Sequence, residues 1–216
     1  SILKNKVFSN GYIFYGPEGI GKKETAIDFI KKIFEQYSSN SNIEEKIIDN
    51  NYPDFLLIEP TYLIKGNLMN RSEVESPKNN KEIIRIDQIR NIKIFLSQKS
   101  IESGKKIVLI IDAHLLNEAS SNCLLKTLEE PTNGIFILLT SKLDLLLDTI
   151  VSRCQLIKFK SYSYKKLEIF IQNKLDAQPL DSYKDFIKLA NGSPRKMLNN
   201  IKIWNELPNE IKDNLE

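Results

Sequence analysis

The run KIVLIIDAH, residues 106–114, constrains the fold more than any other stretch of the chain. It is almost continuously apolar until it reaches an acid, Asp112. A strand with one solvent-exposed face alternates apolar and polar residues, whereas a strand covered on both faces is apolar throughout. The run therefore predicts a central strand of a parallel sheet that is covered by helices on both faces.

Four further apolar runs extend this pattern along the chain. They are 12–15 (YIFY), 54–60 (DFLLIEP), 134–141 (GIFILLTS) and 155–159 (QLIKF). Apolar residues recur at helical spacing in 25–36 and in 84–98, where Asp87 is the expected helix cap. The proline of LLKTLEEP, Pro131, is expected to end a helix that follows Asp112. This alternation predicts an α/β fold with a five-stranded parallel sheet and helices on both faces.

The strand patterns stop near residue 160. Three helical stretches follow, namely 163–175, 181–192 and 193–204. Gly192 and Pro194 mark the junction between the last two. We therefore expect an α/β domain over 1–160 and a small all-α domain over 161–216.

Two intervals within the first domain are polar and lack regular periodicity. They are 37–53 and 61–82. Both are expected to be loops or insertions, so the domain is insertion-rich over 38–82.

Composition excludes several classes of protein. Thirty-one basic and 28 acidic residues give a net charge of +3, which permits contact with nucleic acid without arguing for it. Two widely separated cysteines, Cys123 and Cys154, exclude a disulfide framework and a cysteine-based zinc module. No apolar run approaches the roughly 20 residues of a membrane span, and the first residues lack a signal-peptide pattern. These features predict a cytoplasmic protein without membrane contact.

The stretch GPEGIGKKE, residues 16–24, matches the phosphate-binding pattern G-x-x-x-x-G-K. Between a strand and a helix, such a loop directs backbone N–H groups at phosphate oxygens, and Lys22 can reach the outer phosphates. The alternative is a tight turn that binds nothing. Lys23 stands where a Ser or Thr normally holds Mg²⁺, and an ammonium has no acceptor for a metal. Either Lys23 turns away, or the site prefers a nucleotide without well-held Mg²⁺.

Asp112 provides the second half of an ATPase centre, an acid at the end of a central strand. In ATPases of this architecture the next residue is usually the Glu that orients the attacking water, but here it is Ala113. Loss of a general base typically costs about 10²- to 10⁴-fold in rate. Slow or absent ATP hydrolysis is therefore the expected behaviour.

Residues 112–155 closely resemble bacterial clamp-loader subunits of the AAA+ superfamily. The resemblance depends on LLKTLEEP (124–131) and SRC (152–154); it is continuous from about residue 11 to 160 and looser over the helical part that follows. The spacing from Asp112 to LLKTLEEP is similar to that of delta-prime subunits of the DNA polymerase III clamp loader. The resemblance implies a P-loop AAA+ domain, 1–160, followed by a helical lid, 161–216. It also implies that the C-terminal collar domain of such subunits is absent.

The resemblance gives roles to single residues. In this family the arginine of SRC reaches the ATP of a neighbouring subunit, so Arg153 is the expected catalytic residue, an arginine finger acting in trans. The alternative is a surface arginine favoured by a helix dipole. Thr140 lies where AAA+ proteins sense the γ-phosphate, although it could equally cap the next helix. The only histidine, His114, is expected to be non-catalytic. The complete set of expected nucleotide-binding residues is Gly16, Pro17, Glu18, Gly19, Ile20, Gly21, Lys22, Lys23, Asp112, Thr140 and Arg195.

Arg195 belongs to that set because lid domains of this family direct such an arginine at bound nucleotide. Without the resemblance it would be an ordinary solvated helix position. ATP or ADP is the expected ligand, Mg²⁺ binding is doubtful, and zinc is not expected, since 38–82 lacks the four-cysteine module of many relatives. The implied partners are the gamma/tau and delta subunits, with the sliding clamp and primer-template DNA reached through the complex.

Three functional hypotheses remain open from the sequence. The first is a scaffold subunit of the DNA polymerase III holoenzyme that helps to load the sliding clamp, lends Arg153 to a neighbour and is not an efficient ATPase alone. The second is a motor-type, gamma/tau-like ATPase in which Glu118 replaces the missing base. The third is an inert fold that uses ATP or ADP as a structural plug.

Overall fold

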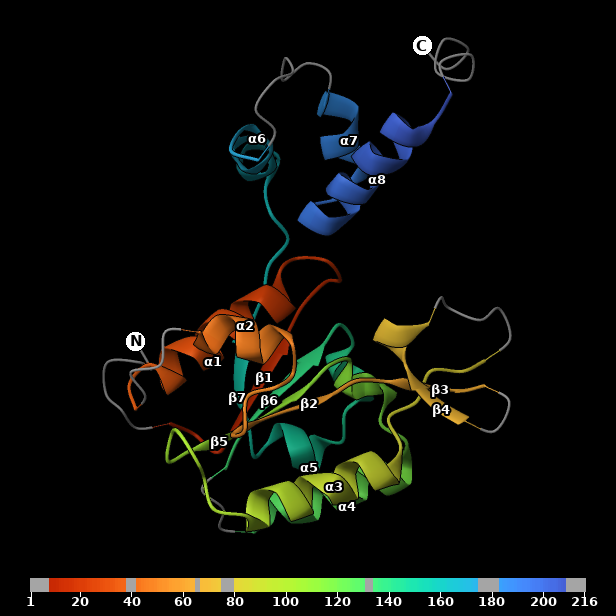
Figure 1. Cartoon of the computed structure of the whole chain (residues 1–216). Coiled ribbons are helices and arrows are strands. Elements are labelled where there is room, and N and C mark those ends of the chain that lie inside the picture. The colour runs from red at the N-terminus through yellow and green to blue at the C-terminus, as the bar shows by residue number, and fades with distance from the viewer. Residues whose placement is uncertain are drawn as a thin grey trace. The chain divides into compact units, whose positions relative to one another are not determined.

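A computed structural model describes residues 8–37, 42–64, 67–74, 80–130, 134–174 and 183–208 (Figure 1). Its contacts divide the chain into two compact units, which are considered separately. Unit 1 comprises residues 1–15 and 22–158, and unit 2 comprises residues 16–21 and 159–216. The glycine loop therefore groups with the C-terminal helices, whereas we had placed it within 1–160. No helix of the described part is long and apolar enough to cross a membrane.

Unit 1 is built on a five-stranded sheet. Its strands are β1 (Gly11–Tyr15), β2 (Phe55–Ile58), β5 (Lys106–Ile110), β6 (Gly134–Thr140) and β7 (Gln155–Lys158). They lie in the order β2-β5-β6-β1-β7, and every neighbouring pair is parallel. All residues of β5 and β6 are buried, as a strand covered on both faces requires. The predicted five-stranded parallel sheet is confirmed.

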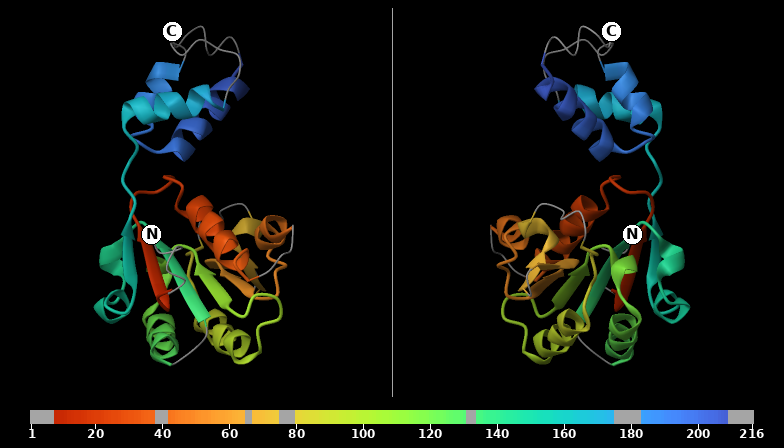
Figure 2. Two further views of the ribbon diagram at one scale, coloured as in Figure 1. Left: turned by 90° about the vertical axis from the view of Figure 1, so that its left-hand side faces the viewer. Right: turned by 90° about the vertical axis from the view of Figure 1, so that its right-hand side faces the viewer.

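Helices cover both faces of this sheet (Figures 1 and 2). One face is covered by α1 (Lys22–Phe34), with α2 (Ile43–Ile48) packed beside it. The other is covered by α3 (Ile86–Ser97), α4 (Glu118–Glu129) and the short α5 (Asp148–Val151). Strand β1 shows the two-sided packing directly, because the rings of Tyr12 and Phe14 meet Phe29 of α1 while Ile13 enters the core on the opposite face.

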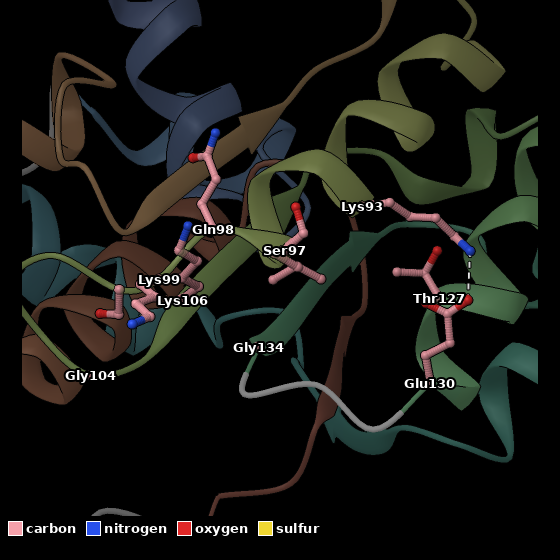
Figure 3. A pocket seen from close by; sticks show the side chains of 11 residues that line it. Lys93, Ser97, Gln98, Lys99, Gly104, Lys106, Thr127, Glu130 and Gly134 are labelled. Carbon is pink, nitrogen blue, oxygen red and sulfur yellow. Dashed lines mark hydrogen bonds and ion pairs between the residues drawn. The ribbon is translucent and has the colours of Figure 1, made fainter.

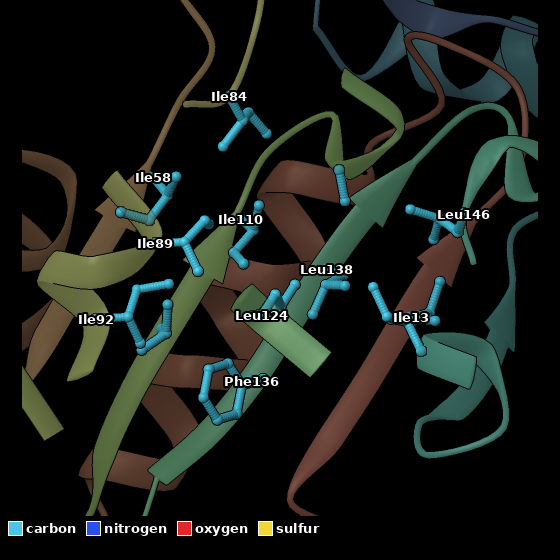
Figure 4. Packing of buried hydrophobic residues seen from close by; sticks show 13 residues of the cluster. Ile13, Ile58, Ile84, Ile89, Ile92, Ile110, Leu124, Phe136, Leu138 and Leu146 are labelled. Carbon is cyan, nitrogen blue, oxygen red and sulfur yellow. The ribbon is translucent and has the colours of Figure 1, made fainter. Parts of the chain in front are cut away.

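The core on that opposite face gathers buried aliphatic side chains from strands and helices of unit 1 (Figure 4). Phe136 and Leu138 of β6 lie in it beside Leu124 of α4, and α3 contributes Ile89 and Ile92. Each fully buried Ile, Leu or Phe side chain stabilises the fold by about 1.5–3 kcal/mol. The apolar runs and helical stripes of the sequence therefore meet where the pattern predicts.

One expectation about unit 1 is wrong in detail, and one falls on residues that the structure does not describe. Helix α3 begins at Ile86 with Arg85 as its N-cap, so Asp87 lies inside the first turn and pairs with Arg90 at 2.9 Å. The reason is local: the Gln88 side chain accepts a hydrogen bond from the backbone N–H of Arg85 at 2.9 Å, which fixes the start of the helix there. Pro131, expected to end α4, lies outside the described residues.

The intervals expected to be loops contain regular structure. Helix α2 lies within 37–53, and an antiparallel hairpin of β3 (Thr61–Ile64) and β4 (Asn67–Asn70) lies within 61–82, followed by a 3₁₀ turn, Arg71–Glu73. The hairpin was missed because its four-residue strands are too short to show a period. Its anchor is tertiary, since Tyr62 is buried and Thr61 exchanges backbone hydrogen bonds with Ile83.

Unit 2 contains the three helices expected after residue 160. They are α6 (Tyr164–Gln172), α7 (Lys184–Leu189) and α8 (Pro194–Glu206). Their small core includes Leu167, Ile187 and Met197. Ser193 caps α8 by accepting a hydrogen bond from the N–H of Lys196 at 3.2 Å, and Pro194 occupies the first turn, where its missing N–H costs nothing.

Gly11 provides a test of packing between β1 and the SRC segment. A Cβ at Gly11 would lie 2.6 Å from Sγ of Cys154, which is too close for van der Waals contact. We expect Gly11→Ala to lower the free energy of unfolding by about 1–3 kcal/mol, because the surrounding atoms must shift. Urea denaturation measures this, and Gly11→Ala combined with Cys154→Ala should recover part of the loss. Strictly additive effects would contradict the contact.

Candidate functional site

The carboxyl ends of β2, β5 and β6 bring polar side chains to one edge of unit 1. Glu59 directly follows β2, Asp112 lies two residues beyond β5, and Thr140 ends β6. Because neighbouring strands are parallel, these ends lie together, and Ile111 confirms this by donating to the carbonyl of Ile58 at 2.9 Å. In open α/β sheets this is the edge where ligands bind.

His114 lies among the predicted residues of this edge. Its Nδ1 is 3.2 Å from the hydroxyl of Thr140. Burial lowers the pKa of His114; Asp112 opposes this, and the positive charges of Lys142, Lys22 and Arg71 add to the lowering. The structure therefore gathers Lys22, Asp112 and Thr140 around the single histidine.

Thr140 also contributes to the turn that follows β6. Its hydroxyl accepts from the backbone N–H of Lys142 at 3.0 Å, which closes the turn after β6. Its side chain is fully buried. The next helical element, the 3₁₀ turn Leu143–Leu145, has Lys142 as its N-cap and no side-chain cap hydrogen bond, so the capping alternative for Thr140 is wrong, and a sensing role for Thr140 remains a prediction.

Arg71 is the residue of this edge that sequence reasoning missed. Its Nη2 lies 2.7 Å from Oδ2 of Asp112, and its Nη1 lies 3.2 Å from Oε2 of Glu82. Burial opposes the charge of Arg71, but the hydrogen bonds and charges of Asp112 and Glu82 raise the pKa of Arg71 above its usual value. The hydroxyl of Tyr62 donates to the other oxygen of Glu82. Arg71 thus holds the Asp112 carboxylate in place, and Arg71 and Tyr62 together hold that of Glu82.

Lys23 is paired with a second carboxylate at the same edge. Its Nζ lies 3.9 Å from Oε1 of Glu59, whose other oxygen accepts from the Ser72 hydroxyl at 2.5 Å. The ammonium thus lies beside an acid of the same edge, and both alternatives left open for Lys23 stay predictions. Ala113, next to Asp112, is fully buried and brings no carboxylate.

These contacts decide whether Mg²⁺ fits the residues present. A divalent ion needs oxygen ligands, chiefly carboxylates, hydroxyls and phosphates. At this edge Asp112 is bound to a guanidinium, and the position after Lys22 offers an ammonium instead of a hydroxyl. A divalent metal ion therefore does not fit these residues as they are arranged.

The glycine loop belongs to unit 2, where it contacts the start of α8. Gly19 has φ +73°, and a Cβ there would lie 2.4 Å from the Ser193 hydroxyl, so only glycine fits. The Gly19 carbonyl accepts from that hydroxyl at 3.1 Å and from the backbone N–H of Arg195 at 3.2 Å. Arg195 is thus brought to the loop through its backbone. Of the remaining loop residues, Ile20 is buried and Glu18 is exposed.

Arg153 lies on the surface of unit 1, just beyond α5, with 39% of its side chain exposed. Its Nη2 is 2.7 Å from Oε1 of Glu129, and its Nη1 donates to the carbonyl of Thr149 at 2.9 Å. The contact with a helix carbonyl agrees with the helix-end alternative, while the exposure leaves the guanidinium accessible to another molecule. Burial raises the pKa of the neighbouring Cys154 thiol to about 11, which excludes it as a nucleophile near neutral pH.

Comparison with known proteins identifies the family. Residues 1–163 match the family described as DNA polymerase III, delta subunit. The chain belongs to this family. The prediction of a delta-prime-type clamp-loader protein with the AAA+ fold is confirmed.

Individual relatives agree with this assignment. The chain is 29% identical over 194 residues to DNA polymerase III subunit delta' of Pseudomonas aeruginosa, covering 86% of this chain and 54% of that protein. It is 30% identical over 179 residues to subunit tau of Bacillus subtilis, covering 82% of this chain and 29% of that protein. The fold is similar to a gamma subunit-related protein of Thermotoga maritima, with a TM-score of 0.59 and 21% identity over 94% of this chain and 58% of the other. The chain thus spans only part of its relatives' length.

The delta-family chain also has a cavity of about 480 Å³ at the opposite end of the sheet (Figure 3). It lies beside Lys106 and Gly134, the first residues of β5 and β6, and is therefore separate from the edge that carries Asp112. Two of its lysines are engaged: Lys93 pairs with Glu130 at 2.6 Å, and Lys106 donates to the Phe95 carbonyl at 2.6 Å. Burial also lowers the pKa of Lys106. The negative charge of Asp54 opposes this lowering but does not cancel it.

The sequence predicted Asp112, Lys22 and Thr140 as residues of this site. It did not predict the other charged residues of the same edge. Glu59 could have been found, because it is an acid at the end of an apolar run, the same signal that identified Asp112. Arg71 carried no such signal, since it lies in a polar interval, in the 3₁₀ turn that directly follows the short strand β4. Glu118, considered as a substitute base, is the exposed first residue of α4.

Proposed function

We propose that this chain acts as a clamp-loader subunit in DNA replication that hydrolyses little ATP itself and supplies Arg153 to an ATP site on a neighbouring subunit. The main observation behind this proposal is a contrast between two places on unit 1. Its own sheet edge has a buried alanine beside Asp112, and Arg71 and Lys23 are paired with the edge carboxylates. Arg153, by contrast, is exposed. The neighbours proposed for it are gamma/tau and delta subunits, with the sliding clamp and primer-template DNA as shared ligands of the complex.

Hydrolysis needs a group that orients water, and the edge lacks one at the usual place. A buried methyl group at residue 113 neither accepts a proton nor binds water. The arginine, in turn, can stabilise negative charge on a transferred phosphoryl group only if it leaves Glu129 for a site outside its own chain. This division of roles supports a subunit that acts on its neighbour's nucleotide.

The similarity to a tau subunit supports the second candidate, an ATP-hydrolysing motor. In that case Glu118 would act as the base and Lys22 would be required for turnover. The two candidates differ in what a change at Lys22 does.

We expect Lys22→Ala to leave ATP hydrolysis by the reconstituted clamp-loader complex nearly unchanged, because this chain contributes little hydrolysis. The measurement is steady-state phosphate release from the complex and from the isolated chain. Glu118→Gln tests the base of the motor candidate separately and should also have no effect. A large loss with Lys22→Ala, or rapid hydrolysis by the isolated chain, would establish the motor instead.

A further inference from the structure

The β3–β4 hairpin brings a cation to the acid at the end of β5. The contact is direct, with 2.7 Å between Nη2 of Arg71 and Oδ2 of Asp112, and both side chains are partly buried, with 35% and 24% of their surfaces exposed. A charged, short hydrogen bond of this kind is among the strongest in proteins. The carboxylate that would hold a metal ion in an ATPase of this fold already has a counter-ion from its own chain.

Several contacts fix Arg71 in that position. Its backbone N–H donates to the carbonyl of Pro60 at 3.0 Å, which ties the 3₁₀ turn to the segment that follows β2. Asn70, the residue before the turn, contacts the Glu73 carboxylate through its backbone and side-chain nitrogens at 3.1 and 3.0 Å. Glu82 binds the other nitrogen of the guanidinium. The cation is therefore held by backbone and side-chain contacts on both sides.

The same turn also occupies the second carboxylate of the edge. Ser72, next to Arg71, donates to Glu59, and Glu59 faces Lys23. One turn thus satisfies both acids that flank the ends of β2 and β5. Asp112 itself has a left-handed backbone, φ 50°, which for a residue with a side chain is uncommon and is tolerated best by Asn and Asp.

We propose that Arg71 is a built-in cation that replaces a divalent metal ion on Asp112, so that this edge accepts the phosphates of a nucleoside di- or triphosphate free of Mg²⁺. The choice of a nucleotide as the ligand rests on the proposed function. The exclusion of a metal ion from Asp112 rests on the geometry alone. It explains why a lysine is tolerated after Lys22, because no metal has to be held there. It also gives a function to the hairpin that carries Arg71.

Mn²⁺ is the probe for the exclusion of metal. Since the chain has one histidine, its imidazole proton signals are recognisable without further assignment, and His114 lies two residues from Asp112. We expect sub-stoichiometric Mn²⁺ to leave these signals sharp in the wild type and to broaden them in Arg71→Gln. The double variant Arg71→Gln with Asp112→Asn should be sharp again, which assigns the metal to that carboxylate. Arg90→Gln, which removes an arginine from an exposed pair with Asp87, should behave as the wild type.

The outcomes of this experiment are distinct. Broadening in the wild type equal to that in Arg71→Gln overturns the proposal, as does the absence of broadening in Arg71→Gln. Circular dichroism checks that each variant is folded, and Arg71→Lys, which keeps the charge, should exclude Mn²⁺ at least in part. An Arg71→Lys protein that binds Mn²⁺ as well as Arg71→Gln does would contradict a role for the charge.

A second measurement tests the ligand. We expect a fluorescent ADP analogue to bind the wild type with a Kd that changes by less than about twofold between Mg²⁺ and EDTA, because no carboxylate is available to the metal. Arg71→Gln should lose metal-free affinity and gain from Mg²⁺. Tighter binding to the wild type with Mg²⁺, or no binding in either buffer, overturns the proposed ligand. These results do not depend on Arg153, so they are separate from a failure of the proposed function.

Discussion

Arg153→Ala should abolish rapid hydrolysis at one ATP site of the reconstituted clamp-loader complex while leaving this chain folded. Arginine fingers contribute about 10³- to 10⁵-fold to phosphoryl transfer, because they stabilise charge that develops only in the transition state. The affected site is on the neighbour that Arg153 faces, so other sites should keep their rates. Rapid-quench measurement of the first turnover distinguishes the loss of one site from a general slowing.

The fold should tolerate this change. Among the described residues, the Arg153 side chain is bound at the surface by Glu129 and by the carbonyl of Thr149. Exposed ion pairs contribute about 0–1 kcal/mol, so the melting temperature should change little. Glu129→Gln is an informative companion, since it releases the guanidinium without removing it and should preserve hydrolysis. Arg90→Ala serves as the control for loss of a surface arginine. An unchanged first turnover in the Arg153→Ala complex would contradict the finger.

Asp54→Asn should lower the free energy of unfolding by about 3–5 kcal/mol, the largest loss of stability that we expect from a single change. Asp54 directly precedes β2 and is fully buried. Its carboxylate accepts hydrogen bonds from the backbone N–H groups of Ile101, Glu102 and Ser103, each at 2.8 Å. The hydroxyls of Ser100 and Ser103 add two more. An amide has one acceptor oxygen in place of two and brings N–H donors towards other donors.

The same carboxylate predicts a dependence on pH. Burial opposes the charge of Asp54, but the hydrogen bonds from the loop lower its pKa below the ordinary value of 3.8. A pKa that is lower in the folded state means that the unfolded chain binds the proton more readily. The stabilisation is therefore complete above about pH 5 and is lost as the pH falls through the folded pKa.

Urea denaturation of the wild type and of Asp54→Asn between pH 3 and pH 7 measures both effects. The difference between the two proteins should shrink as the pH falls. Asp87→Asn is the matched control, because Asp87 is exposed on α3 and pairs only with Arg90 among the described residues. We expect it to cost less than about 0.5 kcal/mol. A comparable loss in both variants would contradict the account of Asp54.

Local patterns predicted the parts of the candidate site that depend on strand ends. Asp112 and Thr140 follow apolar runs, and parallel strands bring such ends to one edge whatever the intervening chain does. Lys22 was predicted because its loop has a recognisable spacing. The start of α3 was misplaced by one to two residues, since the choice between Arg85 and Asp87 as cap depends on a hydrogen bond of Gln88 that no pattern contains.

The sequence by itself determined the α/β class, the five strands, the three C-terminal helices and the family, because each follows from periodicity or from a short motif. Only the tertiary structure decided what the acids of the sheet edge contact. Arg71 and Asp112 are 41 residues apart along the chain. A pairing over that distance depends on the hairpin that carries the arginine. The physical reason is that ion pairs form between whichever side chains the fold brings within about 4 Å. Strands of four residues are also too short to show a period in the sequence, so their positions cannot be predicted from it.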